Sequence, residues 1–123
     1  MRSSSYEARI FALVNDERAQ RGLRRLSATR CGADFATRWA DHLAHDGRLR
    51  HQAVQRVVGT CRARRGAENI AMGNVTPDRM VQLWMKSRSH RANILDPRLT
   101  HLGVGAEQAA DGAWYGVQVF LGY

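Results

Sequence analysis

Apolar residues recur at helical spacing near the start of the chain. The stripe that they form comprises Ile10, Phe11, Leu13 and Val14. Ser4 and Glu7 precede it as a capping-box pair, whose hydroxyl and carboxylate accept the free amide hydrogens at a helix start. Gly22 offers the left-handed conformation at which helices end. The pattern predicts a helix over residues 4–21.

A second helical stretch runs from about Thr29 to His45, and Gly47 follows it as a stop. Its apolar face comprises Phe35, Ala36, Trp39, Ala40 and Leu43. Residues 46–66 are rich in Arg, Gly and Gln, which predicts a loop that holds one helical turn. The stretch "GAENIAMGN" (66–74) is too short for a helix and predicts an extended segment or a turn.

A further helix begins at Thr76, which is suited to the N-cap and is followed by Pro77 and Asp78 at the positive end of the helix dipole. Its broad apolar face is typical of core packing rather than of ligand contact. That face comprises Met80, Val81, Trp84 and Met85. The polar run "SRSHR" (87–91) predicts the end of this helix and a turn toward the next element, with Asn93 as a structural hydrogen-bonding residue.

After Pro97 the pattern changes to the period of two that is typical of strands. Two such runs, "HLGVGAEQ" and "AWYGVQVFLGY", are joined by a turn that contains Asp111 and Gly112. In the second run, one face is expected to carry Tyr115, Val117, Val119 and Leu121, and the other Trp114, Gly116, Gln118 and Phe120. Helices followed by an antiparallel hairpin predict an α+β fold, and 123 residues suffice for one domain, 1–123.

The net charge of the chain and its distribution limit the classes of binding partner that the sequence indicates. The chain has 19 basic and 11 acidic residues and a formal net charge of +8, and Lys86 is its only lysine. The arginines are spread over the whole chain without interleaved aromatic residues, so the pattern does not indicate sequence-specific nucleic-acid binding. Weak attraction to anionic envelope polymers or lipid headgroups fits better. No apolar run has the length of a membrane span or a signal-peptide core, so the leader of an exported protein is expected to be absent from this chain.

The two cysteines, Cys31 and Cys61, are not in a C-x-x-C arrangement, which excludes a redox pair or a zinc ribbon. They form either one disulfide, which would close a loop of about thirty residues, or two buried thiols. An even count in a small basic domain favours the disulfide and an oxidising compartment.

The five histidines differ in their surroundings. His42 and His45 are expected to be exposed near a helix end, with no third metal ligand nearby. His51 and His90 lie in irregular sequence, and Glu68 is the only carboxylate in a stretch of apolar residues. Two imidazoles and one carboxylate suit a zinc ion with an open position. Spacing alone favours structural roles instead, with Glu68 accepting amide hydrogens in a tight turn and His90 donating to a carbonyl.

Several motifs occur together with His51 in a characteristic order along the chain. They are "VNDERAQRGL", "FATRWADHLA", "GAENIAMGN", "MVQLWMKSRSHRANIL", "LGVGAE" and "WYGVQVF". Together they resemble the compact bacterial branch of the CAP superfamily, the SCP-domain proteins that include cysteine-rich secretory proteins, antigen 5 and plant pathogenesis-related proteins. The resemblance covers nearly the whole chain and implies an α–β–α sandwich, with a small antiparallel sheet between layers of helix.

The resemblance also implies an open cleft. His51 and His90 would be able to bind zinc or another divalent metal there, and Glu68 would orient a histidine or a bound water. Ser87 stands where the animal members carry a second glutamate, so one of two carboxylates is missing. Gln118 matches a glutamine whose side chain faces the same cleft.

These residues predict a monomeric, non-catalytic binding module that is secreted or held at the cell envelope. Its ligand is expected to be a divalent metal, an apolar lipid-like or envelope-derived molecule, or both. The alternative is a metal-dependent hydrolase of peptides or envelope polymers, in which zinc on His51 and His90 activates water and Glu68 is the general base. The missing carboxylate at Ser87 favours binding over catalysis.

Overall fold

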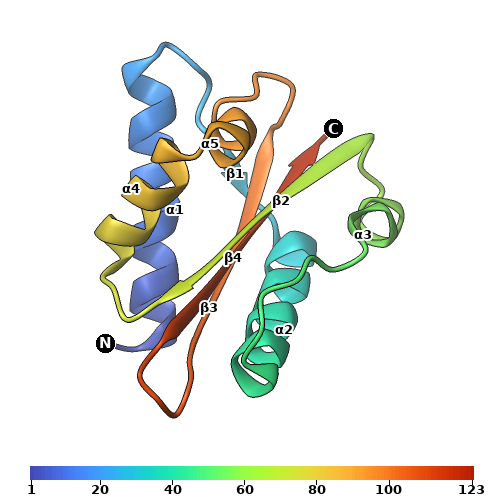
Figure 1. Ribbon diagram of the computed structural model, residues 1–123. Coiled ribbons are helices and arrows are strands. Elements are labelled where there is room, and N and C mark those ends of the chain that lie inside the picture. Colours follow the sequence, from blue (N-terminus) through green and yellow to red (C-terminus); the bar gives the residue numbers. More distant parts are fainter.

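A four-stranded sheet lies between two layers of helix in the computed structural model, which describes residues 1–123 (Figure 1). Its strands are β1 (Ser27–Ala28), β2 (Arg65–Gly73), β3 (His101–Gln108) and β4 (Trp114–Gly122), in the spatial order β1-β3-β4-β2. Strand β1 pairs in parallel with β3, and the other pairings are antiparallel. The predicted α+β sandwich is confirmed, and the two-residue strand β1 makes its sheet mixed rather than purely antiparallel.

The helices divide between the two faces of the sheet. They are α1 (Ser3–Gln20), α2 (Arg30–Asp46), α3 (Val54–Thr60), α4 (Pro77–Lys86) and α5 (Arg88–Ile94). Helices α1, α4 and α5 cover one face, and α2 and α3 cover the other (Figure 1). The run predicted as an irregular junction is the separate helix α5, because Ser87 is extended (φ −95°, ψ 124°) and interrupts the path from α4. None of the helices combines the length and the apolarity needed to cross a bilayer.

Strand β4 is the centre of the core. All of its residues are buried, and alternate side chains pack into the two helical layers, as predicted. Toward α1 and α4, the core includes Tyr6, Ile10, Met80, Trp84, Trp114 and Phe120. Toward α2 and α3, it includes Ala36, Leu43, Val57, Tyr115, Val117, Val119 and Leu121. The predicted core role of the apolar face of α4 is therefore confirmed for its two most buried members, Met80 and Trp84.

Two glycines of β3 allow α2 to lie directly on the sheet. A Cβ atom at Gly103 would overlap the backbone of Ala33, and one at Gly105 would overlap the backbone of Ala36. The "GVG" run of β3 is therefore explained by the close approach of a helix to a strand.

The start of α1 differs from the predicted capping box. The helix begins at Ser3, with Arg2 at the N-cap and no side-chain cap. The Glu7 carboxylate instead accepts the backbone N–H of Ala106 in β3, at 2.9 Å. Burial raises the pKa of Glu7, and the bond from Ala106 opposes that rise. The capping-box prediction was wrong because an amide 99 residues away in the sequence takes the carboxylate.

The other helix ends follow their predicted signals. Thr29 caps α2 by accepting the N–H of Gly32 at 3.2 Å, and Thr76 caps α4 by accepting the N–H of Arg79 at 3.1 Å. Gly47 ends α2 in the left-handed conformation, with φ of 73°.

A buried arginine connects α1 to the loops at one end of the sheet. Arg18 is fully buried, and burial lowers the pKa of its guanidinium. The guanidinium donates to backbone carbonyl oxygens at 2.8–3.4 Å, and these belong to Arg24, Ile94, Asp96 and Leu99. The side chain thus satisfies acceptors of two loops, a role that the apolar periodicity of α1 does not indicate.

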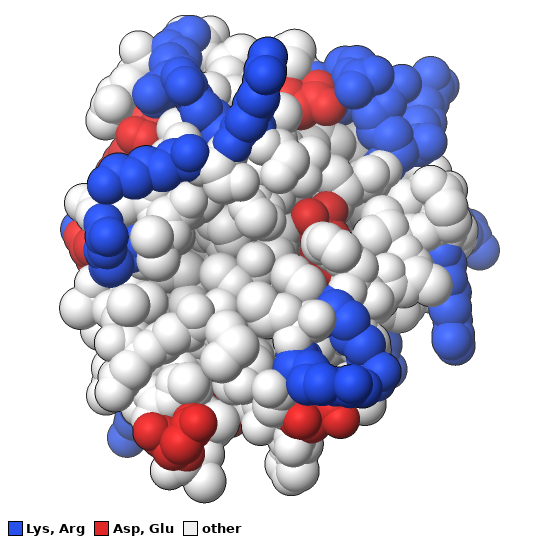
Figure 2. All heavy atoms as spheres, in the orientation of Figure 1, with Lys and Arg blue, Asp and Glu red and all other residues white.

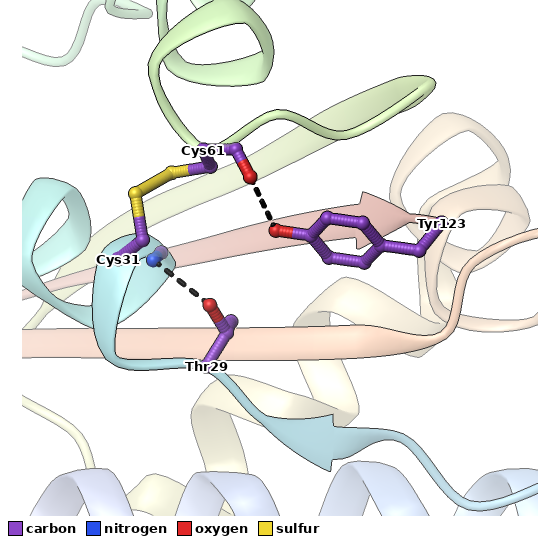
Figure 3. Close-up of a disulfide and its surroundings, with 5 residues drawn as sticks. Thr29, Cys31, Cys61 and Tyr123 are labelled. Carbon is purple, nitrogen blue, oxygen red and sulfur yellow. Dashed lines mark hydrogen bonds between the residues drawn. A yellow bond between two sulfur atoms is a disulfide. The ribbon is translucent and has the colours of Figure 1, made fainter.

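The predicted disulfide between Cys31 and Cys61 is present, with the two Cα atoms 5.7 Å apart. It joins the first turn of α2 to the residue that follows α3 (Figure 3). The hydroxyl of Tyr123 points at the same place and donates to the Cys61 carbonyl at 2.7 Å (Figure 3). The short helix α3 is therefore held at its C-terminal end by a covalent bond and by a hydrogen bond.

Loss of the disulfide should destabilise the protein. The bond closes a loop with a sequence separation of 30 residues, so its removal in the double variant Cys31→Ala/Cys61→Ala should lower the free energy of unfolding by about 3–4 kcal/mol. Denaturant unfolding measures this loss. Tyr123→Phe, which removes only the hydrogen bond to Cys61, should cost about 1 kcal/mol. A double variant no less stable than Tyr123→Phe would contradict the account.

Candidate functional site

The carboxylate of Glu68 is buried in β2, the strand at one edge of the sheet, and its side chain is 1% exposed. The Oε1 atom contacts the Nδ1 atom of His51 at 2.7 Å and accepts the backbone N–H of Gln52 at 3.2 Å. The Oε2 atom accepts the side-chain N–H of Gln52 at 2.7 Å. Both oxygens are therefore engaged by two adjacent residues, which compensates the cost of burying the charge.

His51 lies in the loop between α2 and α3, and its side chain is 58% exposed. A carboxylate only accepts hydrogen bonds, so the 2.7 Å contact with Glu68 places a hydrogen on Nδ1 of the imidazole. In the neutral ring this tautomer leaves the lone pair on Nε2, which has no partner within the chain. Glu68 orients His51 in the way that carboxylates commonly orient metal-binding histidines.

His90 lies in the first turns of α5, and its Nδ1 atom is 2.8 Å from the hydroxyl oxygen of Ser87. Burial lowers the pKa of His90, and the proximity of His51 lowers it further. His90 is therefore neutral near pH 7, and the two imidazoles are electrostatic neighbours although they are 39 positions apart in the sequence. The structure thus pairs His51 with Glu68 and His90 with Ser87, and the two pairs are linked by the electrostatic effect of His51 on His90.

The donor atoms around these histidines fit a divalent metal of the type that prefers imidazole, such as zinc. Each ring has its Nδ1 atom engaged, by Glu68 or by Ser87, and its Nε2 atom free of partners. No group of three or more His, Cys, Asp or Glu side chains converges on one point. The chain therefore supplies two nitrogen ligands at most, and water or a ligand would have to complete the coordination.

Gln118 lies in the interior of the protein, on β4 between β2 and β3. Its side chain is fully buried. The Oε1 atom accepts a hydrogen bond from the side-chain N–H of Asn69 at 3.0 Å, and the Nε2 atom has no hydrogen-bond partner. Gln118 contacts His90 only indirectly, because the same Asn69 amide also donates to the His90 carbonyl at 3.1 Å.

Asn69 is the site residue that the sequence patterns did not reveal. Besides its two bonds as donor, it accepts the side-chain N–H of Asn93 at 2.9 Å. Asn93 is thereby confirmed as a structural hydrogen-bonding residue, and it also reaches the Glu68 carbonyl at 3.5 Å. The indole N–H of Trp84 donates to the backbone carbonyl of Ile70, two residues after Glu68 in β2, at 3.2 Å. These bonds cover the open edge of β2 and attach α4 and α5 to it. The position of Asn69 directly after Glu68 in "GAENIAMGN" was the only available signal.

Two further histidines and a groove between α1 and α4 lie outside this cluster. His42 and His45 are exposed on α2, as predicted. A groove of about 470 Å³ lies between α1 and α4 and has three hydrophobic residues among the eleven that line it. Those three are Leu13, Val81 and Met85.

Comparison with known proteins places the chain in a family. The sequence profile of the cysteine-rich secretory protein family, abbreviated CAP, matches residues 11–120. The chain belongs to the CAP family. A CAP domain with this fold therefore makes up nearly the whole of the described sequence.

The relatives of this CAP domain are mostly longer. Uncharacterized protein YkwD of Bacillus subtilis is 32% identical over 127 residues, a match that covers 97% of this chain and 48% of YkwD. This chain thus spans about half the length of that relative. An extracellular protein of Bacillus anthracis containing an SCP domain has a TM-score of 0.85 at 23% identity, over 98% of this chain and 41% of that chain. An outer surface protein of Borrelia burgdorferi has a TM-score of 0.83 at 18% identity, and the match covers 92% of this chain and 89% of that protein.

Removing the Asn69 side chain should destabilise this CAP domain. Asn69→Ala leaves the buried Gln118 side chain without a partner and removes the bonds from Asn69 to the His90 carbonyl and the Asn93 side chain. The expected loss in the free energy of unfolding is about 2–3 kcal/mol, measured by denaturant unfolding. Asn74→Ala, at an exposed position directly after β2, should change it by no more than about 0.5 kcal/mol. Equal effects of the two substitutions would contradict the role of Asn69.

Stability should also fall in acid because of His90. Its pKa is lowered from the ordinary value of 6.5, so below that pH the unfolded chain takes up a proton that the folded chain resists. Above it both states are neutral at this residue, and no difference arises. In EDTA, the melting temperature of the wild type should therefore fall more steeply between about pH 7 and about pH 5 than that of His90→Gln. His45→Gln should retain the slope of the wild type, and a His90→Gln slope equal to both would contradict this assignment.

Proposed function

We propose that this CAP domain is a non-catalytic binding module that takes up a divalent cation, such as zinc, between His51 and His90. The proposal rests on the contacts that orient the imidazole rings of the two histidines. Glu68 holds the Nδ1 atom of His51, and Ser87 contacts the Nδ1 atom of His90. With Nδ1–H of His90 donating to the Ser87 hydroxyl, both rings present the Nε2 lone pair that a metal requires.

The acid–base properties of the site support cation binding near neutral pH. A proton competes with a metal for an imidazole nitrogen, so a histidine that is already neutral binds metal at less cost. The lowered pKa of His90 reduces that competition.

The surroundings of Glu68 support binding over hydrolysis. A general base must reach a water molecule or the proton that it abstracts. Both Glu68 oxygens are engaged by His51 and Gln52, and the side chain is 1% exposed. Ser87, at the position where the resemblance places a second glutamate, cannot act as a carboxylate base. The arrangement suits a carboxylate that orients a ligand rather than one that transfers protons.

A lipid-like ligand has weaker support. The groove between α1 and α4 is large enough at about 470 Å³, but eight of its eleven lining residues are polar or charged. Met80 and Trp84, the bulkiest apolar residues of α4, are fully buried in the core and do not line it. The cation at the two histidines is therefore the ligand that the geometry supports best.

A location outside the cell or at its envelope is part of the proposal. A disulfide such as Cys31–Cys61 persists in oxidising compartments. The named relatives agree, since one is described as extracellular and another as an outer surface protein.

Calorimetric titration of the metal-free protein with Zn²⁺ tests the proposal. The wild type should bind one ion near pH 7.5, and His90→Ala should lose the binding. Glu68→Gln should weaken it by about 10–100-fold, because the support of His51 is altered. His45→Ala, which removes an exposed histidine of α2, should bind as the wild type does. No binding by the wild type, or an equal loss in His45→Ala, would overturn the proposal.

A further inference from the structure

A second concavity adjoins His51, between α2 and α3. Its volume is about 270 Å³, and four of its seven lining residues are hydrophobic. These are Phe35, Trp39, Ala53 and Val57. The other three are His51, Gln52 and Arg56. The pocket thus combines an apolar wall that contains two aromatic rings with a short polar side.

Arg56 is the only Lys, Arg, Asp or Glu side chain that lines the pocket, and the Glu68 carboxylate lies behind it, bound to His51 and Gln52. No Asp or Glu lines it, and Arg56 forms no ion pair within the chain. Side chains outside the pocket lining also pack on these aromatic rings: the Arg38 guanidinium lies 5.0 Å from the ring centre of Phe35, the Arg50 guanidinium lies 5.7 Å from that of Trp39, and the His42 ring stacks on Trp39. The face seen in Figure 2 carries basic and acidic groups around its rim and an acidic group nearer its centre. A pocket of this kind attracts an anion.

The polar side also offers a hydrogen-bond acceptor. The Gln52 side chain donates to the Glu68 carboxylate at 2.7 Å, which fixes its amide and leaves Oε1 without a partner. The Trp39 indole N–H donates to the Arg50 carbonyl at 2.8 Å, so Trp39 contributes ring surface rather than a donor. A ligand therefore meets an apolar wall, one acceptor and one free guanidinium.

We propose that this pocket binds an acidic sugar, meaning a pyranose ring that bears a carboxylate. The C–H groups of the ring contact the parts of Trp39 and Phe35 that line the pocket, a hydroxyl donates to Gln52 Oε1, and the carboxylate pairs with Arg56. The volume is near the lower end for ligand pockets, which fits one ring of a longer glycan. The inference goes beyond the proposed cation site, because no contact of the sugar needs a metal.

The test is an NMR titration of the ¹⁵N-labelled protein in EDTA, following the Trp39 indole signal. The probes are two acidic sugars, methyl β-glucuronide and N-acetylmuramic acid, with their neutral counterparts methyl β-glucoside and N-acetylglucosamine. At least one acid should shift the Trp39 signal in a saturable way, and its neutral counterpart should bind at least about tenfold more weakly. Because EDTA removes metal, a failure here leaves the Zn²⁺ titration unaffected and the two proposals distinguishable.

Two matched variants test whether Arg56 binds the carboxylate of the sugar. Arg56→Gln should weaken the acid by about tenfold, which is the effect of losing one charged hydrogen-bonding partner. Arg79→Gln, on the exposed side of α4, lowers the net charge equally and should leave the affinity within about twofold. Equal weakening by both variants, equal binding of the neutral sugars, or no response to either acid would overturn the proposal. Equal binding of cyclohexanecarboxylate, an apolar ring with the same charge, would overturn its assignment to a sugar.

Discussion

The buried carboxylate of Glu68 is the constraint on which the candidate site depends. An ionised group in the protein interior costs several kcal/mol unless donors surround it. Here all the donors come from His51 and Gln52, so the loop between α2 and α3 must lie against β2 for the charge to be compensated. The disulfide holds the far end of α3 in place, and His51 therefore has a defined position although its side chain is largely exposed.

The next residue of the same strand performs the corresponding task for the other helical layer. Successive side chains of a strand point to opposite faces, so Asn69 faces α5 while Glu68 faces the loop before α3. Asn69 binds the His90 carbonyl and the Asn93 side chain, and Gln118 supports it from the centre of the sheet. Two adjacent polar residues on an edge strand thus position the segments that carry both histidines. This explains how His51 can influence the pKa of His90 although the two residues are 39 positions apart in the sequence.

Much of the fold could be predicted from local patterns, because periodicity, capping residues and the turn at Asp111 and Gly112 act over a few positions. The site could not be predicted in that way, and His51, Glu68 and His90 came together only through the family resemblance. Spacing alone favoured structural roles, and it was partly right, since Glu68 does accept an amide hydrogen. Glu7, Arg18 and Asn69 were misassigned or missed because their main partners lie far away in the sequence. A polar residue in a predicted helix or strand does not indicate which distant carbonyl or amide will meet it.

The tautomers of the two histidines directly test whether Glu68 and Ser87 orient the imidazole rings for metal binding. Long-range ¹H–¹⁵N correlation spectra of the metal-free protein near pH 7.5 distinguish a protonated Nδ1 atom from a protonated Nε2 atom. Both His51 and His90 should carry their hydrogen on Nδ1, held by Glu68 and Ser87, and both Nε2 signals should shift when Zn²⁺ is added. A hydrogen on Nε2 of either ring, or Nε2 signals that ignore the metal, would contradict this orientation for metal binding.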